Sequence, residues 1–172
     1  HTNLSFSFGY FSGTSTREYD AALDQFVRFP TVPFGNASDL TAALNLYEHI
    51  SASGATPYHA AFDALQRNVR NDELAGVQKD YVVIFMSDGQ PTDISGNVLS
   101  GITSLVQNLR TEAKTNGTSE LSVSSVYFCP ANDTTSILNL QTMASVGQGQ
   151  FVDTNQQAQI QINDIISVPN CH

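Results

Sequence analysis

The sequence is poor in basic residues. Only seven Lys and Arg stand against 16 Asp and Glu among its 172 residues, which gives a formal net charge of −9 at pH 7. Because binding to phosphates needs a clustered basic surface, the scarcity and scattering of cations argue against a nucleic-acid partner. Apolar runs are also short, and none approaches the roughly 18 residues needed to cross a bilayer. We therefore expect neither a nucleic-acid partner nor a membrane span.

Cysteine and histidine are scarce as well. The two cysteines, Cys129 and Cys171, are too few for a disulfide scaffold or a zinc site. We expect them to form one disulfide that ties the C-terminal tail to the body of the domain; two reduced thiols are the alternative. Of the four histidines, two are terminal, and His49 and His59 lack a His or Cys partner at metal-ligand spacing, which argues against zinc.

The usual signatures of catalysis are missing too. Hydrolases of the α/β type need Gly-x-Ser-x-Gly at a strand-to-helix turn. In residues 9–13, Gly-Tyr-Phe-Ser-Gly, the serine comes one place late. Gly-rich phosphate-binding loops are absent. We expect that the chain is not an enzyme.

The sequence does contain alternating strand and helix patterns, and its hydrophobic content of 41% is enough for a folded core. Segment 27–34 carries two prolines and can only be an edge strand or irregular. The pattern predicts one α/β domain over residues 1–172, doubly wound around a mainly parallel central sheet flanked by helices. Strands are predicted at 4–11, 81–86, 121–129 and 150–153, and helices at 16–29, 38–50, 57–69, 97–114, 135–145 and 157–166.

The most informative stretch is 81–92, Tyr-Val-Val-Ile-Phe-Met-Ser-Asp-Gly-Gln-Pro-Thr. Six apolar residues without alternation predict a short strand buried on both faces, as in a parallel sheet. Gly89 and Pro91 then predict a turn. Asp88 falls at the carboxyl end of the strand, where α/β folds place their ligands, so it is a candidate site residue. A plain role in the turn is the alternative.

A second stretch, 53–57 with the sequence Ser-Gly-Ala-Thr-Pro, opens the helix that precedes this strand. Thr56 is placed to N-cap that helix, and Pro57 falls at the first helical position. A hydroxyl from Thr56 and a carboxylate from Asp88, at neighbouring helix and strand ends, would suit a hard divalent cation that prefers oxygen ligands. Each residue alone is also explained by its local role.

Residues 88–92, Asp-Gly-Gln-Pro-Thr, resemble the fourth-strand motif of von Willebrand factor A (vWA) domains, and residues 53–57 resemble the Gly-Gly-Thr-Pro segment of that family. The resemblance implies a metal-ion-dependent adhesion site (MIDAS). In it, Thr56 would bind Mg²⁺, Mn²⁺ or Ca²⁺ directly, and Asp88 would bind mostly through water. The open coordination position would take an acidic side chain of a protein partner.

The partner-binding rim of this site is predicted at Gly89, Gln90 and Asp93, with the alternative that Asp93 caps the helix that follows it. The family begins with a strand that ends in Asp-x-Ser-x-Ser, lies at the centre of the sheet and supplies two serine ligands. No strand of this sequence ends in that motif. We therefore expect a single vWA-like domain that lacks its first strand and helix, and a preceding segment or a second chain that supplies the strand.

The resemblance implies protein–protein recognition or adhesion by a secreted or cell-surface protein. One alternative is a structural or assembly domain of a larger surface or pilus-like protein, with a degenerate metal site. Another is an intracellular domain that assembles complexes. A Cys129–Cys171 disulfide would favour an oxidising compartment. Four Asn-x-Ser/Thr triplets, which are acceptor sites for glycosylation, begin at Asn3, Asn36, Asn116 and Asn132.

Overall fold

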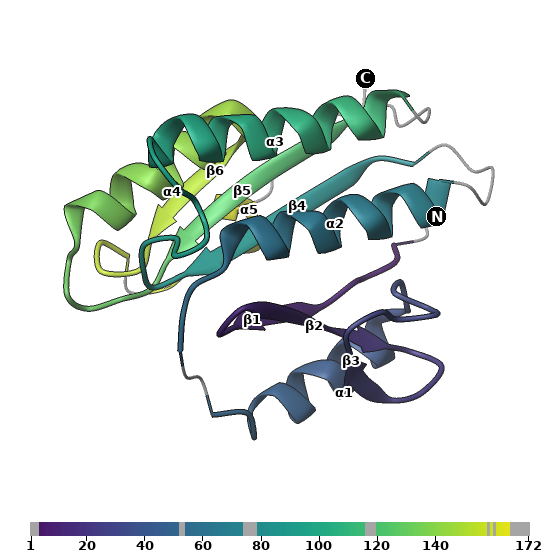
Figure 1. The fold of residues 1–172 in the computed structure, drawn as a ribbon. Coiled ribbons are helices and arrows are strands. Elements are labelled where there is room, and N and C mark those ends of the chain that lie inside the picture. The colour runs from purple at the N-terminus through teal and green to yellow at the C-terminus, as the bar shows by residue number, and fades with distance from the viewer. Residues whose placement is uncertain are drawn as a thin grey trace.

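The structure, a computed structural model, describes residues 4–51, 54–73, 79–115, 120–157, 159 and 161–165. Helices and strands form two small sheets and their covering layers (Figure 1). The strands are β1 (Gly9–Ser12), β2 (Ser15–Asp20), β3 (Gln25–Val27), β4 (Tyr81–Ser87), β5 (Leu121–Tyr127) and β6 (Gln148–Asp153). The helices are α1 (Ala37–Tyr47), α2 (Tyr58–Glu73), α3 (Val98–Thr115), α4 (Thr134–Gly147) and α5 (Ile162–Ile165).

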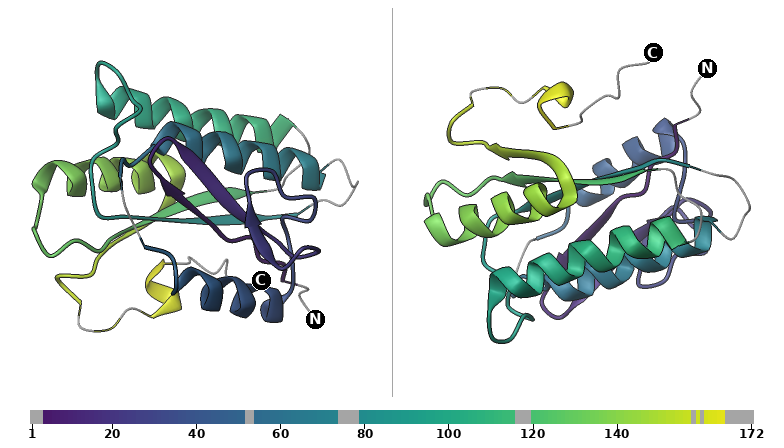
Figure 2. Two further views of the ribbon diagram at one scale, coloured as in Figure 1. Left: turned by 60° about the horizontal axis from the view of Figure 1, so that its bottom comes forward. Right: turned by 90° about the horizontal axis from the view of Figure 1, so that it is seen from above.

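One sheet is parallel, with the strand order β4-β5-β6. Its first pair is in register from Tyr81 opposite Leu121 to Ser87 opposite Tyr127. Seen from above, α2, α3 and α4 lie on one side of this sheet and α5 lies on the other (Figure 2). The predicted α/β class and the parallel sheet are confirmed. The carboxyl ends of β4, β5 and β6 therefore meet at one edge, where a site can form.

The core lies between the parallel sheet and the three helices on that side. Residues of α3 at helical spacing, within the helix that the sequence predicted at 97–114, are buried there together with side chains of α2 and α4. Predicted elements at 57–69, 81–86, 97–114, 121–129, 135–145 and 150–153 are confirmed, with ends shifted by a few residues. Large side chains buried in this core include Phe62, Phe85, Ile102, Leu109, Val123, Leu140 and Met143.

The other sheet is antiparallel, with the order β1-β2-β3, and it corrects the helix predicted at 16–29. The carboxylate of Asp20 is fully buried and accepts hydrogen bonds from Ala22 N at 2.9 Å and Thr31 Oγ1 at 2.8 Å. This local side-chain bonding stabilises a turn in competition with a helix. The apolar residues that suggested a helical stripe instead pack across strands, with the Tyr10 and Phe26 rings 5.0 Å apart.

Strand β4 is buried on one face only, contrary to the prediction of burial on both. Tyr81, Val83 and Phe85 point into the core, whereas Val82, Ile84 and Met86 are 47%, 38% and 52% exposed. Within the described ranges, β4 pairs with β5 and with no strand on its other edge. A run of apolar residues shows that a strand is apolar, but it does not show which neighbours cover it.

The two sheets meet through aromatic contacts. The ring of Phe11, on β1, stacks on that of Phe85, on β4, with centroids 5.2 Å apart and an interplanar angle of 20°. No backbone ladder joins β1 to β4 in the described part of the chain. No helix in those ranges is both long and apolar enough to cross a membrane.

Candidate functional site

The loop after β4 and the loop before α2 lie against each other. Asp88 follows the buried Ser87 and is exposed to solvent. A Cβ atom added to Gly89 would lie 3.4 Å from Thr56 Oγ1, so the hydroxyl of Thr56 faces the turn that carries Asp88. The structure thus brings together the two loops that the sequence predicted to form a site.

Three hydrogen bonds fix the two loops. Thr56 N donates to Thr92 Oγ1, and Thr92 N donates to Thr56 O, both at 3.0 Å. Beneath them, the hydroxyl of Tyr58 donates to Gly89 O at 3.0 Å. Burial, together with the nearby charge of Asp88, raises the pKa of Tyr58 to about 12, so the hydroxyl remains a donor at physiological pH. The turn is therefore held from the core side by a buried tyrosine.

Asp93 caps α2, which corrects the expectation that it caps the helix that follows. Its two carboxylate oxygens accept from His59 N and Ala60 N, each at 3.0 Å. The cap of α3 is Asn97, whose Oδ1 accepts from Ser100 N at 3.0 Å. A carboxylate at the positive end of the α2 dipole is a favourable arrangement. The chain turns back after β4, and this places Asp93 at the start of α2, a helix that comes earlier in the sequence.

The cap by Asp93 changes the interpretation of Thr56, whose side chain the sequence placed as the N-cap of α2. Within the described residues, Thr56 Oγ1 makes no hydrogen bond to the amides of that helix. Its hydroxyl is therefore open to another role, and a hydroxyl together with a carboxylate from the adjoining turn would suit Mg²⁺. In the same residues, no group of three or more His, Cys, Asp or Glu side chains is arranged to hold a metal. Thr56 and Asp88 make at most part of a metal site.

Gln90, predicted at the rim, reaches towards α4. Its Nε2 donates to Asp133 Oδ2 at 3.0 Å, and Asp133 N-caps α4 through Thr135 N. Asp133 N in turn donates to the hydroxyl of the buried Tyr127 at 2.9 Å. The hydrogen bond from Gln90, followed by that from the Ser136 hydroxyl, holds the pKa of Asp133 below its usual value. Gln90 therefore connects the ends of β4 and β5.

Sequence reasoning missed Asp133 as part of this edge. The signal was present, because Asp is a preferred N-cap residue and Asp133 directly precedes the helix that begins at Thr134. Cys129 follows β5 and is half-buried, while Cys171 lies outside the described residues, so their disulfide stays a prediction. Of the glycosylation triplets, Asn132 is exposed and Asn36 N-caps α1; the other two also lie outside the described ranges.

Comparisons of the chain with protein-family models, with curated proteins and with solved structures give no match. The α/β class and the parallel sheet rest on the structure itself, and function is inferred from the strand-end loops.

Proposed function

We propose that this chain is a doubly wound, vWA-like domain that recognises a protein partner outside the cytoplasm through a divalent-metal face at the carboxyl end of β4. The observation that supports this most directly is the approach of the Thr56 hydroxyl to the turn carrying Asp88 and Gly89. That pair is at the edge of a parallel sheet where ligands bind in α/β folds. We propose no catalytic activity.

In this proposal Thr56 would bind Mg²⁺ directly and Asp88 would bind it mostly through water. A bound Mg²⁺ would supply an open coordination position for a carboxylate of the partner. Mg²⁺ keeps several waters but needs more protein oxygens than these two to bind firmly. The hydrogen bond from Tyr58 to Gly89 O positions the turn, and Asp93 fixes the start of α2 beside it.

The remaining ligands would come from an additional strand beside β4. The side chains of Val82, Ile84 and Met86 are exposed on β4, and among the described residues no strand pairs with the outer edge of β4. Open edges with apolar side chains favour pairing with a further strand. We propose that a preceding segment or a second chain supplies it. Intact mass under native and then denaturing conditions tests for a second chain, since the extra mass would leave on denaturation.

Calorimetric titration of the full-length protein with Mg²⁺ tests the metal face. The wild type is expected to bind Mg²⁺, and Asp88→Ala and Thr56→Val are expected to abolish binding without changing the melting temperature of the metal-free protein. Glu48→Gln removes an exposed carboxylate elsewhere and should bind as the wild type does. Unchanged Mg²⁺ binding by Asp88→Ala would remove this site from the function. Absent binding in the wild type would favour a structural or assembly domain with a degenerate metal site.

A further inference from the structure

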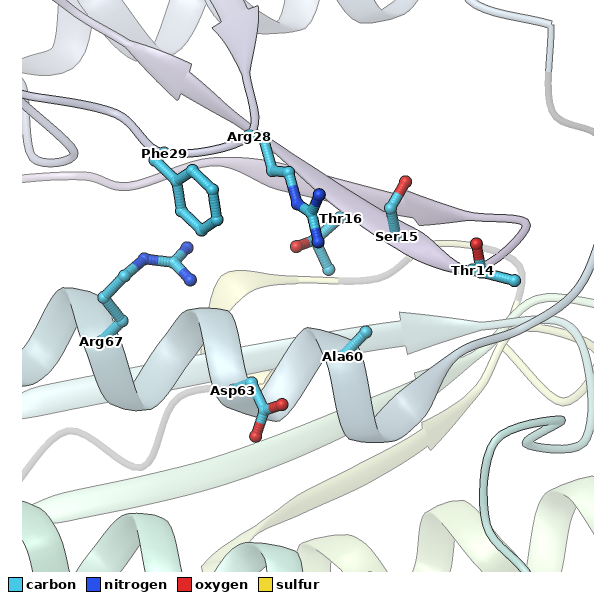
Figure 3. Close-up of a pocket in the computed structure, with 8 residues that line it drawn as sticks. All are labelled: Thr14, Ser15, Thr16, Arg28, Phe29, Ala60, Asp63 and Arg67. Atoms are coloured by element: carbon cyan, nitrogen blue, oxygen red, sulfur yellow. The ribbon is translucent and has the colours of Figure 1, made fainter.

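A pocket of about 180 Å³ opens between β2, the segment after β3 and the first turns of α2 (Figure 3). It lies apart from the Thr56–Asp88 loops. The two meet at the start of α2, where Ala60 lines the pocket and its amide bonds to Asp93. Since one water occupies roughly 30 Å³ of liquid, the pocket has room for a small organic group such as an acidic side chain.

One side of the pocket carries a cation in a defined position. The guanidinium carbons of Arg28 and Arg67 lie 5.3 Å and 5.0 Å from the centroid of the Phe29 ring. Arg67 is paired with the buried carboxylate of Glu18, whereas no carboxylate among the described residues pairs with Arg28. In a chain of net charge −9, Arg28 is thus a cation that can bind an external anion, and Phe29 holds it by a cation–π contact.

Hydroxyl groups accompany this cation. Thr14, Ser15 and Thr16, where the β1–β2 turn enters β2, line the pocket, and their hydroxyls make no hydrogen bond to the rest of the described structure. Figure 3 shows the Thr16 hydroxyl beside the guanidinium of Arg28 on the strand side, opposite the helix that carries Asp63 and Arg67, whereas the Ser15 hydroxyl points away from Arg28. A guanidinium with a neighbouring hydroxyl donor is suited to a carboxylate, which accepts several hydrogen bonds.

The helix side of the pocket limits what can bind. The Asp63 side chain is 59% exposed and contacts His59 Nδ1 at 3.3 Å. Its negative charge opposes a dianion such as phosphate more strongly than a single carboxylate. The same carboxylate can accept a hydrogen bond from an N–H or O–H group next to the bound anion.

We propose that this pocket binds one carboxylate group that has an N–H or O–H donor close to it. Arg28 and the hydroxyl of Thr16 would bind the carboxylate, and Asp63 would accept from the donor. An acidic residue of a peptide and a free amino or hydroxy acid share this chemistry. The proposal does not depend on the metal face.

Amide NMR titration of the full-length protein in EDTA tests the pocket, because EDTA excludes any contribution from a divalent metal. The probes are N-acetyl-glutamate amide, its neutral analogue N-acetyl-glutamine amide, free glutamate and inorganic phosphate. We expect saturable shifts at Ser15, Thr16 and Phe29 with either glutamate probe and none with the neutral analogue. Tighter binding of N-acetyl-glutamate amide than of free glutamate would indicate that the ligand is an acidic residue of a peptide. The opposite order would indicate a free acid. Tighter binding of phosphate, or equal binding of the glutamine analogue, would overturn the proposal.

Variants assign the binding to named side chains. Arg28→Gln is expected to weaken binding of N-acetyl-glutamate amide at least tenfold, or about 1.4 kcal/mol. Arg17→Gln removes an exposed arginine of β2 that does not line the pocket, so its affinity should stay unchanged. Asp63→Asn is expected to tighten the binding of phosphate by removing the opposing charge. Equal losses in Arg17→Gln and Arg28→Gln would show that only the general charge of the surface is involved, and no effect of Asp63→Asn would overturn the assigned role of Asp63 in the pocket.

Discussion

Removing the carboxylate of Asp93 should destabilise the domain, although this residue is exposed and lies outside every helix. Asp93 accepts from His59 N and Ala60 N at 3.0 Å each, so Asp93→Ala leaves two amides at the start of α2 without a protein partner. Loss of an N-cap costs about 0.5–2 kcal/mol, and loss of a negative charge at a helix start costs about 0.3–1 kcal/mol. Because Asp93 is exposed, water replaces part of the lost hydrogen bonding and part of the lost interaction between the charge and the helix dipole. We expect a loss of about 1–2 kcal/mol in the free energy of unfolding.

The matched control is Thr56→Val, which keeps the volume of the side chain and removes only the hydroxyl. Because the structure assigns the capping of α2 to Asp93, this change should cost less than about 0.5 kcal/mol. Asp93→Asn keeps one acceptor oxygen and should fall between the two. Urea unfolding followed by far-UV circular dichroism measures all three, since the chain has no tryptophan to report by fluorescence.

The relative size of the stability losses in Asp93→Ala and Thr56→Val decides which of the two residues caps α2. A larger loss for Thr56→Val than for Asp93→Ala would show that Thr56 caps α2 through its hydroxyl. That result would refute the assigned cap and would also withdraw the Thr56 hydroxyl from the metal face.

Three further changes test the fold. Burial alone would raise the pKa of Asp20, but hydrogen bonds from Thr31, Ala22 and Val32 together outweigh burial and hold the pKa below its usual value. The stabilisation is therefore present above about pH 4 and is lost as the pH falls through the folded-state pKa. Asp20→Asn should lower stability at pH 7 by about 2–3 kcal/mol and flatten the acid limb, measured by urea unfolding at several pH values; an unchanged acid limb would contradict this. Gly149→Ala should cost about 1–3 kcal/mol in the same assay, because its Cβ would collide with the carbonyl of Val123; wild-type stability would show that the β5–β6 contact can relax. Reducing the predicted Cys129–Cys171 disulfide should cost roughly 3–4 kcal/mol, and an unchanged melting temperature would mean that no bridge exists.

The elements that the sequence predicted best are those whose signal is local and periodic. The stripe of α3, including Ile102, Val106 and Leu109, is buried as its spacing indicated. The six-residue apolar run of β4 identified a strand with correct bounds to within one residue. The approach of Thr56 to the Asp88 turn followed from the rule that strand ends and helix starts meet at one edge of a parallel sheet.

The errors concern interactions between residues distant in sequence. Tyr19, Leu23 and Phe26 have helical spacing, but the buried Asp20 bonds to Thr31 and stabilises a turn between strands instead. No pattern near α2 shows that its cap is Asp93, more than thirty residues further along the chain. Burial of the two faces of β4 likewise depends on the elements that pack beside the strand. The run of apolar residues in the sequence does not show which elements these are.

The most direct test of the metal face is a titration of the ¹⁵N-labelled full-length protein with Mn²⁺, observed by amide NMR. Mn²⁺ broadens amide signals close to its binding site. The proposal predicts that signals of Thr56, Asp88 and Gly89 broaden first and recover when excess Mg²⁺ displaces Mn²⁺. Broadening centred on another carboxylate such as Asp63, or even broadening over the whole acidic surface, would contradict a metal site at the end of β4.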